Sequence, residues 1–467
     1  MRSLIVVVAL LVLVPLFKFC AERPTMTIVP IYAFSLPLAS VVELNVPLPP
    51  PFNTLSSLLG AFLLAAVFVH ITVFERARVP SPPVGLWCLF MAWVSLTALW
   101  APSSGKAMQG LMIAVPLVMV MIAFSLLNWS RRDIDVLRLA IVISGLVVGA
   151  YALYLLVSGA GLPSHGVNAR FSVTSDAEDT DPNILAASLL LPMAMALEMF
   201  VYTRITWWSR RTSRWIGGCA LILTLFAIIA TGSRGGLLGS FAAIVLTLYF
   251  AGRSARGRQV APRSASSLVT LLVGFALVVG AIGLLSPDAV QNVVGSDPIQ
   301  RLTRPDSSGR NDIWKAGYLA CERHCDHGIG IGNFVAAYNE TFPFSGATGN
   351  IGLNRPAHNT YLQIAVETGF VGLALLLVAL ASEWAALSMA PAREIMPAQR
   401  AALAALLIAE VFLTAIWFKF FWLLIAVDRA IEAAPEQESV ASESPGPDGL
   451  PPTLAAPVMR RAGVVET

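Results

Sequence analysis

Apolar runs of about 16 to 25 residues recur along nearly the whole chain, and polar residues fall mainly in the segments between them. Each run is long enough to cross a hydrocarbon core of about 30 Å. Backbone groups in lipid must be hydrogen-bonded within their own segment, so these runs predict helices, and the alternation expected of an outer-membrane barrel is missing. The pattern therefore predicts an all-α, polytopic integral membrane protein.

We expect about twelve transmembrane helices. Their approximate bounds are 4–20, 27–42, 55–74, 84–100, 107–127, 134–158, 182–202, 215–231, 235–251, 267–286, 359–382 and 400–427. The run at 400–427 is long for one span and short for two, and it contains Glu410 and Lys419, so the side of the membrane on which the chain ends stays open. We interpret Met1 to Cys20, which looks like a signal peptide, as a retained first span.

Arginines gather in alternate loops between these runs. They are Arg76, Arg78, Arg131, Arg132, Arg204, Arg210, Arg211, Arg214, Arg253, Arg256, Arg258, Arg263, Arg393 and Arg400. The positive-inside rule places these loops on the cytoplasmic side. The other loops then face outward, and they include 159–181, a tight turn at 232–235 and one large outer loop at about 287–358.

Composition agrees with this class. Of the 467 residues, 56% are hydrophobic and 13% are charged, whereas soluble domains carry about 25% charged residues. The formal net charge of +3 is too small to indicate a nucleic-acid partner. Residues 1–430 are predicted to form one membrane domain embedded in the lipid bilayer, and 431–467, rich in Pro, Ser, Glu and Ala, a disordered tail.

Two outward-facing arginines are candidates for an anion site. Arg234 lies in TGSRGG, whose glycines permit a very tight turn and close approach to the backbone. Arg310 lies in SSGRNDIWKAG, where Ser and Gly lead into a helical pattern. The alternatives are an Arg234 that reaches the lipid headgroups and a solvated Arg310.

His358 and Asn359 precede the span at 359–382, at its outer end. A helix N-terminus offers free N–H groups and a positive dipole end. A neutral histidine in such a place can act as a base near pH 7.

HN followed by nine residues and then GxxG (His358, Asn359, Gly369, Gly372) resembles the signature loop of the O-antigen ligase and Wzy-type polymerase family. The segments TGSRGG, GRNDIWKAG, GIGIGNF (328–334), DPNILA (181–186) and KFFWLLIAV are also similar to that family. The resemblance covers residues 181–427; before them only the pattern of spans agrees.

The resemblance implies a GT-C-like glycosyltransferase of the bacterial inner membrane with its active site on the periplasmic face. Its donor would be a glycan on undecaprenyl diphosphate, and its acceptor either lipid A-core, for a ligase, or another lipid-linked glycan, for a polymerase. Arg234 and Arg310 are then assigned to the pyrophosphate, His358 to the acceptor hydroxyl and Asn359 to its orientation. Arg170 is either a third phosphate contact or a surface arginine. The resemblance implies no cofactor and no metal.

Two clusters permit a metal as an alternative. Asp176, Glu178, Asp179 and Asp181 could bind Mg²⁺, but Asp181 before Pro182 is also typical of a helix N-cap, and the others of a solvated loop. The cysteines and histidines of CERHCDH (321–327) match no zinc-finger spacing. A disulfide between Cys321 and Cys325 is possible in an oxidising compartment, although we expect helical geometry to disfavour it, which leaves ordinary loop residues as the first interpretation.

Two further interpretations concern buried charge and a rival function. We expect Glu198 and Glu367 to bond neighbouring helices or backbone rather than to do acid chemistry. A transporter or lipid-linked glycan flippase is the alternative function, because about twelve spans is a common transporter size. Such a protein should place ionisable groups near the membrane midplane in related halves, whereas Arg170, Arg234, Arg310 and His358 are predicted to lie on one face.

Overall fold

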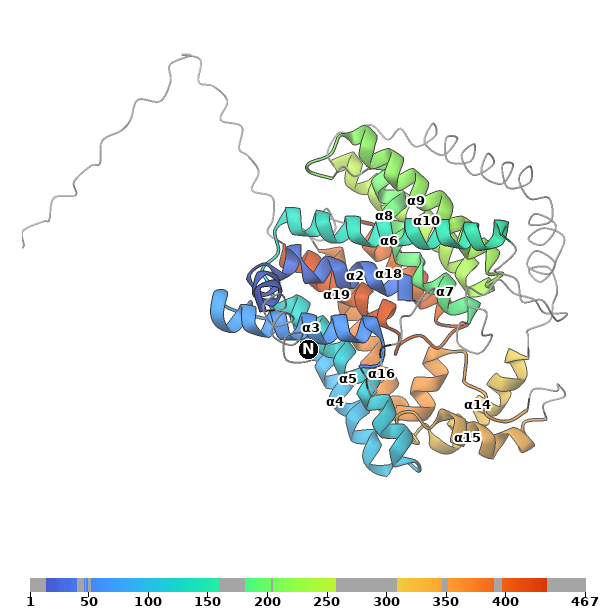
Figure 1. Ribbon diagram of the computed structural model, residues 1–467. Helices are drawn as coiled ribbons and strands as arrows, with labels where there is room; N and C mark the ends of the chain where they lie inside the picture. Colours follow the sequence, from blue (N-terminus) through green and yellow to red (C-terminus); the bar gives the residue numbers. More distant parts are fainter. Residues whose placement is uncertain are drawn as a thin grey trace, which may run out of the picture. The chain divides into compact units, whose positions relative to one another are not determined.

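The computed structural model describes residues 14–39, 46, 48, 52–158, 181–202, 205–257, 309–346, 352–389 and 397–434. Within these ranges it is built from helices and contains no strand (Figure 1). The predicted all-α class is confirmed.

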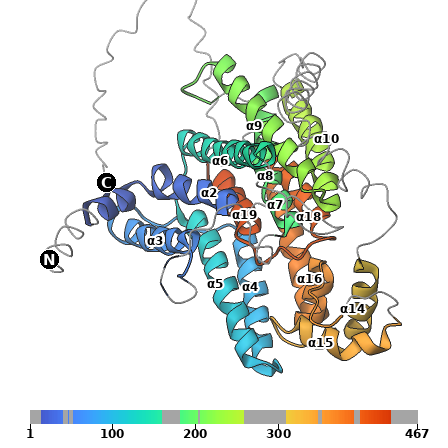
Figure 2. The same cartoon turned by 45° about the vertical axis from the view of Figure 1, so that its right-hand side comes forward.

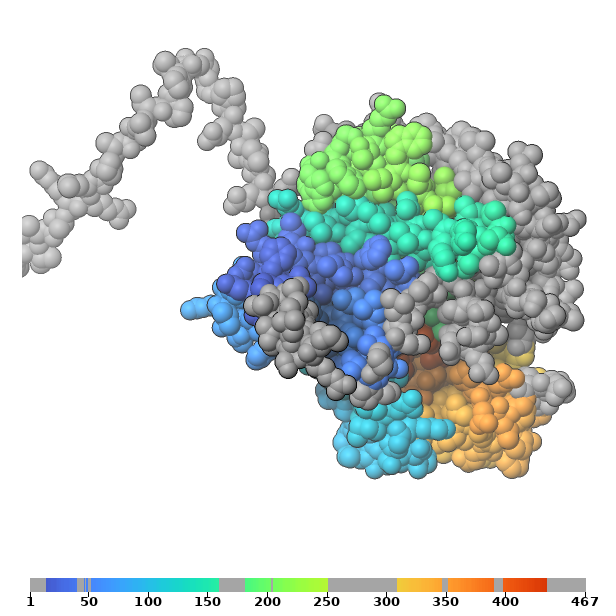
Figure 3. All heavy atoms as spheres, in the orientation of Figure 1, coloured from blue at the N-terminus to red at the C-terminus, as the bar shows by residue number. Residues whose placement is uncertain are grey.

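Besides the helical residues 14–22, the described part of the first half contains five α-helices. They are α2 (Ile28–Ala39), α3 (Leu55–Val69), α4 (Pro82–Thr97), α5 (Ser104–Leu126) and α6 (Arg131–Val157). Capping side chains fix the starts of two of these helices. Ser103 caps α5, and Ser130 with Asp133 forms a capping box at α6. Side chains of α2, α3 and α6 form much of the face drawn in Figure 3.

The second half contains nine described α-helices. They are α7 (Pro182–Ser188), α8 (Leu190–Val201), α9 (Arg210–Ala230), α10 (Arg234–Gly257), α14 (Arg310–His324), α15 (Phe334–Thr341), α16 (Thr360–Ser388), α18 (Pro397–Ala409) and α19 (Lys419–Ala433). The last helix continues to Ala433, past the domain end predicted at 430. The remainder of the predicted tail lies outside the described residues.

Seven helices in the described part are long and apolar enough to cross a membrane. They correspond to the predicted spans at 55–74, 84–100, 107–127, 134–158, 182–202, 215–231 and 359–382. The spans predicted at 27–42 and 235–251 are present as shorter apolar helices. Those at 4–20 and 267–286 lie wholly or largely outside the described residues, so the predicted number of spans stays a prediction.

The apolar run at 400–427 forms parts of two helices. Helix α18 ends at Ala409, α19 begins at Lys419, and Glu410 to Phe418 lie between them without forming a continuous helix. We call Glu410 to Phe418 the interhelical loop. This break explains the two charged residues of the apolar run: Glu410 is the first residue of the interhelical loop, and Lys419 is the first residue of the helix that follows it.

Helix α10 packs along α18 and α8, and α8 packs against α9. Glycines let α10 approach its neighbours closely. A Cβ at Gly236 would lie 2.5 Å from the Cβ of Ala186 on α7, and one at Gly239 would lie 3.0 Å from the carbonyl oxygen of Ala405 on α18. Helix α14 packs against both α15 and α16, and the three helices lie together in both views (Figures 1 and 2). This packing brings helices from 181–257 against those of the C-terminal third.

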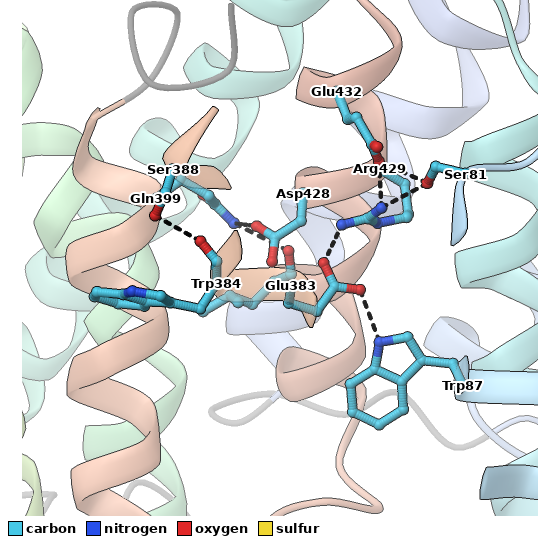
Figure 4. A network of polar contacts seen from close by, with 10 residues as sticks. Ser81, Trp87, Glu383, Trp384, Ser388, Gln399, Asp428, Arg429 and Glu432 are labelled. Atoms are coloured by element: carbon cyan, nitrogen blue, oxygen red, sulfur yellow. Dashed lines mark hydrogen bonds and ion pairs between the residues drawn. The ribbon is translucent and has the colours of Figure 1, made fainter. Parts of the chain in front are cut away.

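Buried charges join α16 to α19 near their C-terminal ends (Figure 4). Arg429 forms ion pairs with Glu383 and Glu432, and its guanidinium also donates to Ser81 Oγ at 2.7 Å. The indole of Trp87 donates to the Glu383 carboxylate at 2.7 Å. A charge inside a bundle is costly unless paired, so this network ties α4, α16 and α19 together.

A second buried network confirms the structural role predicted for Glu198. Its carboxylate accepts a hydrogen bond from the backbone N–H of Ala398 at 2.7 Å and lies 3.8 Å from the Arg138 guanidinium. Arg138 also donates to Asp135 at 2.9 Å. Glu198 therefore links α8 to α6 and to the start of α18.

Candidate functional site

Three of the predicted site residues lie at helix N-termini. Arg234 is the first residue of α10 and Arg310 is the first residue of α14. Asn359 is the N-cap of α16, and His358 directly precedes it. Arg170 lies outside the described residues, so its predicted contact with phosphate stays a prediction.

The turn before Arg234 is as tight as its sequence predicts. Helix α9 ends at Ala230, and Gly232 has a φ of 59°, in the left-handed region that favours glycine. Ser233 Oγ then accepts a hydrogen bond from the Gly236 N–H at 3.1 Å, which satisfies one of the free donors at the start of α10. Arg234 is half-buried.

Gly309, with a φ of 75°, precedes α14 and is its N-cap. Arg310 is half-buried. One turn later the indole of Trp314 donates a hydrogen bond to the carbonyl oxygen of Ala357 at 3.1 Å. The start of α14 is thus attached to the residue that precedes His358.

His358 has a φ of 46°, which is uncommon for a residue with a side chain and costs free energy unless its surroundings hold it. Asn359 Oδ1 accepts the Leu362 N–H at 3.0 Å and so caps α16. Both residues are half-buried. A strained backbone beside a helix N-terminus is a common feature of functional sites.

Trp314 and Phe412 connect these three helix starts. Their ring centroids lie 6.3 Å apart. A Cβ at Gly235, next to Arg234, would lie 3.3 Å from the Cβ of Phe412. Because Trp314 also reaches Ala357, the starts of α10, α14 and α16 lie in one neighbourhood. Helix N-termini and arginines both favour an anion there.

The interhelical loop completes this neighbourhood, and our sequence reasoning did not assign it to the site. Asn359 N–H donates to Thr414 Oγ1 at 3.2 Å, and Thr360 N–H donates to the carbonyl oxygen of Glu410 at 3.0 Å. The signal that could have found it was Glu410 itself, since a carboxylate inside an apolar run needs a partner or a purpose.

The GIGIGNF segment packs into a kink of α16. Gly369 interrupts the helix with a φ of 73° and a ψ of 178°, and a Cβ there would lie 2.9 Å from the backbone carbon of His327. Beside the kink, Ile329 N–H donates to the carbonyl oxygen of Val366 at 2.9 Å. Gly369 of the GxxG motif thus has a packing role.

Glu367 holds the same segment from inside α16. Its Oε1 accepts hydrogen bonds from the Phe334 N–H at 3.2 Å and from the Gln363 amide at 3.1 Å. Phe334 is the first residue of α15, so the carboxylate lies at a helix N-terminus. This confirms the predicted bonding of Glu367 to backbone and to a neighbouring helix.

The expectation that helical geometry disfavours a disulfide between Cys321 and Cys325 is wrong. The two cysteines are bonded, with their Cα atoms 4.7 Å apart, inside the usual range of about 4.4 to 6.8 Å. Cys325 is the C-cap of α14, so the pair spans the last turn, where the helix ends and its backbone brings them close. They are therefore not ordinary loop residues.

Two further residues of CERHCDH, Arg323 and His324, bond to α15. Arg323 donates to Glu340 of α15 at 2.8 Å, and this hydrogen bond is the largest cause that lowers the pKa of the Glu340 carboxyl. His324 lies 3.2 Å from the same carboxylate. Among the described residues, no three His, Cys, Asp or Glu side chains are grouped so as to hold a metal ion.

The alternative interpretations of the acidic cluster are tested only at Asp181. Its carboxylate accepts the Asn183 N–H at 2.9 Å, and Pro182 is the first residue of α7, which confirms the predicted N-cap. Asp176, Glu178 and Asp179 lie outside the described residues.

Apolar helices of spanning length, buried charge networks and a site made from helix N-termini define a polytopic α-helical membrane protein. The model of the O-antigen ligase family matches residues 219–377. This match confirms the resemblance predicted from the sequence. The matched segment contains Arg234, Arg310, His358 and Asn359. No curated protein matches the chain.

Proposed function

We propose that this protein is a membrane glycosyltransferase that moves a polysaccharide from undecaprenyl diphosphate to an acceptor hydroxyl on the periplasmic face. The observation that carries the proposal is the shared neighbourhood of three helix N-termini bearing Arg234, Arg310 and His358, all inside the O-antigen ligase match. Cleavage of a glycosyl diphosphate releases negative charge, and this arrangement offers positive charge where that anion would form.

Arg234 and Arg310 are proposed to hold the diphosphate of the donor. A guanidinium matches phosphate oxygens with two parallel hydrogen bonds, and a helix N-terminus adds free N–H groups and a positive dipole end. Half-burial of both arginines supports this role, because their charges are less screened than they would be in bulk water. Arg170 is proposed as a further contact.

His358 is proposed to act on the acceptor. The acceptor oxygen attacks the anomeric carbon, its proton passes to the imidazole, and the bond from that carbon to the diphosphate oxygen breaks. The products are a new glycosidic bond and undecaprenyl diphosphate. Asn359, through its N-cap bond to Leu362, fixes the backbone next to the base.

Two features support the periplasmic face. Disulfides persist in oxidising compartments, and the Cys321 to Cys325 bond belongs to the predicted outer loop. The arginine-rich loops belong to the opposite set of connections. Together they favour a site outside the bacterial inner membrane.

Lipid A-core and a second lipid-linked glycan remain the two candidate acceptors. Complementation of a strain that lacks its O-antigen ligase and of one that lacks its polymerase distinguishes them. We expect the wild-type protein, and not His358→Ala, to restore either capping of lipid A-core or chain length on a lipopolysaccharide gel. Equal rescue by both proteins would remove His358 from the mechanism.

We propose that the reaction needs no metal. Transfer by the purified protein is then expected to continue in excess EDTA, because Arg234 and Arg310 supply the positive charge that a metal would otherwise provide. Loss of activity in EDTA that returns with Mg²⁺ or Mn²⁺ would contradict this.

A transporter or flippase stays the alternative. In the Arg429 and Arg138 networks, buried charges of the described helices are paired with one another and so have a packing role. Glycan transfer by protein in detergent, where there is no membrane to cross, would exclude transport as the only activity.

A further inference from the structure

The backbone at His358 is anchored on both sides. On the upstream side, Ala357 accepts the indole hydrogen bond of Trp314 at 3.1 Å. On the downstream side, the Asn359 N–H donates to Thr414 Oγ1 at 3.2 Å. A residue with a φ of 46° persists only where its neighbours fix it, so these anchors determine where the imidazole is carried.

Thr360 connects α16 to the interhelical loop through a compact group of hydrogen bonds. Its N–H donates to the carbonyl oxygen of Glu410 at 3.0 Å. Its Oγ1 accepts the Ala415 N–H at 3.1 Å and donates to the Glu410 carboxylate. That carboxylate also accepts from Ala415 N–H at 3.1 Å. One side chain thus closes the loop on itself and on the first residue of α16.

Glu410 is 1% exposed, and its Oε1 is buried without a hydrogen-bond partner in the described part of the chain. A buried carboxylate with one unsatisfied oxygen is destabilising in itself. An apolar residue would fill the same position at lower cost, unless the position needs an acceptor for Thr360 and Ala415. The same loop places Phe412 against Gly235 and Trp314.

The geometry points to Glu410 as a positioning residue: it fixes the interhelical loop against Thr360 and thereby holds His358 in place relative to the starts of α10 and α14. This inference rests on the proposed function, in which His358 acts on the acceptor. Glu410 itself is not placed in contact with substrate.

The test compares Glu410→Leu with Glu410→Gln. Glutamine keeps a side-chain oxygen that can accept from Thr360 and Ala415, whereas leucine has a similar size and no acceptor. We expect Glu410→Leu to lower kcat for glycan transfer by about 10- to 100-fold, a loss similar to that found when groups that orient metal ligands are removed. KM for the donor should change little, and Glu410→Gln should restore kcat to near wild type.

A second readout needs no enzymatic activity. The rate at which diethyl pyrocarbonate modifies His358 is measured by peptide mass spectrometry, with His324 and His327 of the same protein as internal references. Release of His358 from its fixed conformation should raise its rate severalfold in Glu410→Leu and not in Glu410→Gln. If wild type transfers no glycan, the proposed function fails, while this readout still tests the positioning.

A second variant, Thr414→Val, tests the same positioning if Glu410→Leu does not fold. It removes only the hydroxyl that accepts from Asn359, and we expect a smaller fall in kcat with a raised His358 rate at an unchanged melting temperature. Unchanged kcat and unchanged His358 reactivity in folded Thr414→Val and Glu410→Leu would overturn the inference. A fall in the Leu variant that the Gln variant shares equally would also overturn it.

Discussion

His358 lies between two anchored residues in a backbone conformation that few side chains adopt. If its imidazole takes the acceptor proton, His358→Ala should lower glycan transfer by about 100- to 10,000-fold, the usual contribution of a general base. The measurement is initial rate with purified protein. His327→Ala is the matched control, because it removes a histidine of the same outer segment and should leave the rate near wild type.

The proposed role of Arg234 and Arg310 requires the paired hydrogen bonds of a guanidinium as well as its positive charge. Lysine keeps the charge and loses the paired hydrogen bonds, so Arg234→Lys and Arg310→Lys should each still impair transfer. Glutamine at either position should cost about 100- to 1,000-fold in kcat, comparable to removal of a donor from an oxyanion site. Arg323→Gln, in an exposed ion pair, is the control; equal losses in all three would contradict the assignment.

At the scale of the elements, the kink of α16 depends on Gly369. Alanine there meets both an unfavourable φ of 73° and the backbone of His327 at 2.9 Å. Gly346 has a φ of 61° and open space around it, so Gly346→Ala pays only the conformational cost of about 1 to 2 kcal/mol. Gly369→Ala should therefore lower the melting temperature in detergent clearly more than Gly346→Ala. Similar shifts would show that the contact with the 328–334 segment is loose.

Replacing Arg429 should destabilise the protein strongly, because Arg429 is the centre of the buried charge network that joins α16 to α19. Arg429→Met leaves Glu383 and Glu432 without their common partner, and breaking a buried pair in this way costs roughly 3 to 5 kcal/mol. Thermal unfolding in detergent measures the loss. Arg323→Met breaks an exposed pair, which should cost no more than about 1 kcal/mol. A melting temperature for Arg429→Met close to that of Arg323→Met would show that the Arg429 network does not stabilise the packing of α16 against α19.

Helices that are long and apolar could be predicted from sequence because lipid forces one solution on them, and the seven spanning helices of the described part follow that rule. The break between α18 and α19 could not, since an apolar run records hydrophobicity and not the hydrogen bonds that Glu410 makes with Thr360 and Ala415. The disulfide was misjudged for a related reason: the expected helix geometry does not describe the last turn of α14.

We expect the whole molecule to have one orientation in the membrane, with the proposed site on the periplasmic side. The test uses Tyr318→Cys and Arg210→Cys, both at exposed positions, after Cys20, Cys88 and Cys219 are replaced and the disulfide is kept. A membrane-impermeant maleimide should label position 318 from the periplasm and position 210 only after the inner membrane is opened. The reverse pattern would place the proposed site in the cytoplasm.

The candidate site was predictable in its residues and not in its assembly. Arg234, Arg310 and His358 could be identified because each stands next to a Gly or Asn at a predicted helix start. That pattern is visible in the neighbouring residues of the sequence. Their meeting depends on the contact between Trp314 and Phe412, two aromatic residues that lie far apart in the chain, so no local pattern predicts it. Only the packed structure shows that contact.

The proposed glycosyl transfer is tested most directly with purified protein in detergent and a glycan on synthetic undecaprenyl diphosphate as donor, with lipid A-core and lipid-linked glycan offered separately as acceptors. We expect wild type to elongate or cap one of them and to release undecaprenyl diphosphate, whereas His358→Ala, equally folded, should not. Transfer at the same rate by both proteins, or no transfer by wild type to either acceptor with a donor it binds, would contradict the proposed function.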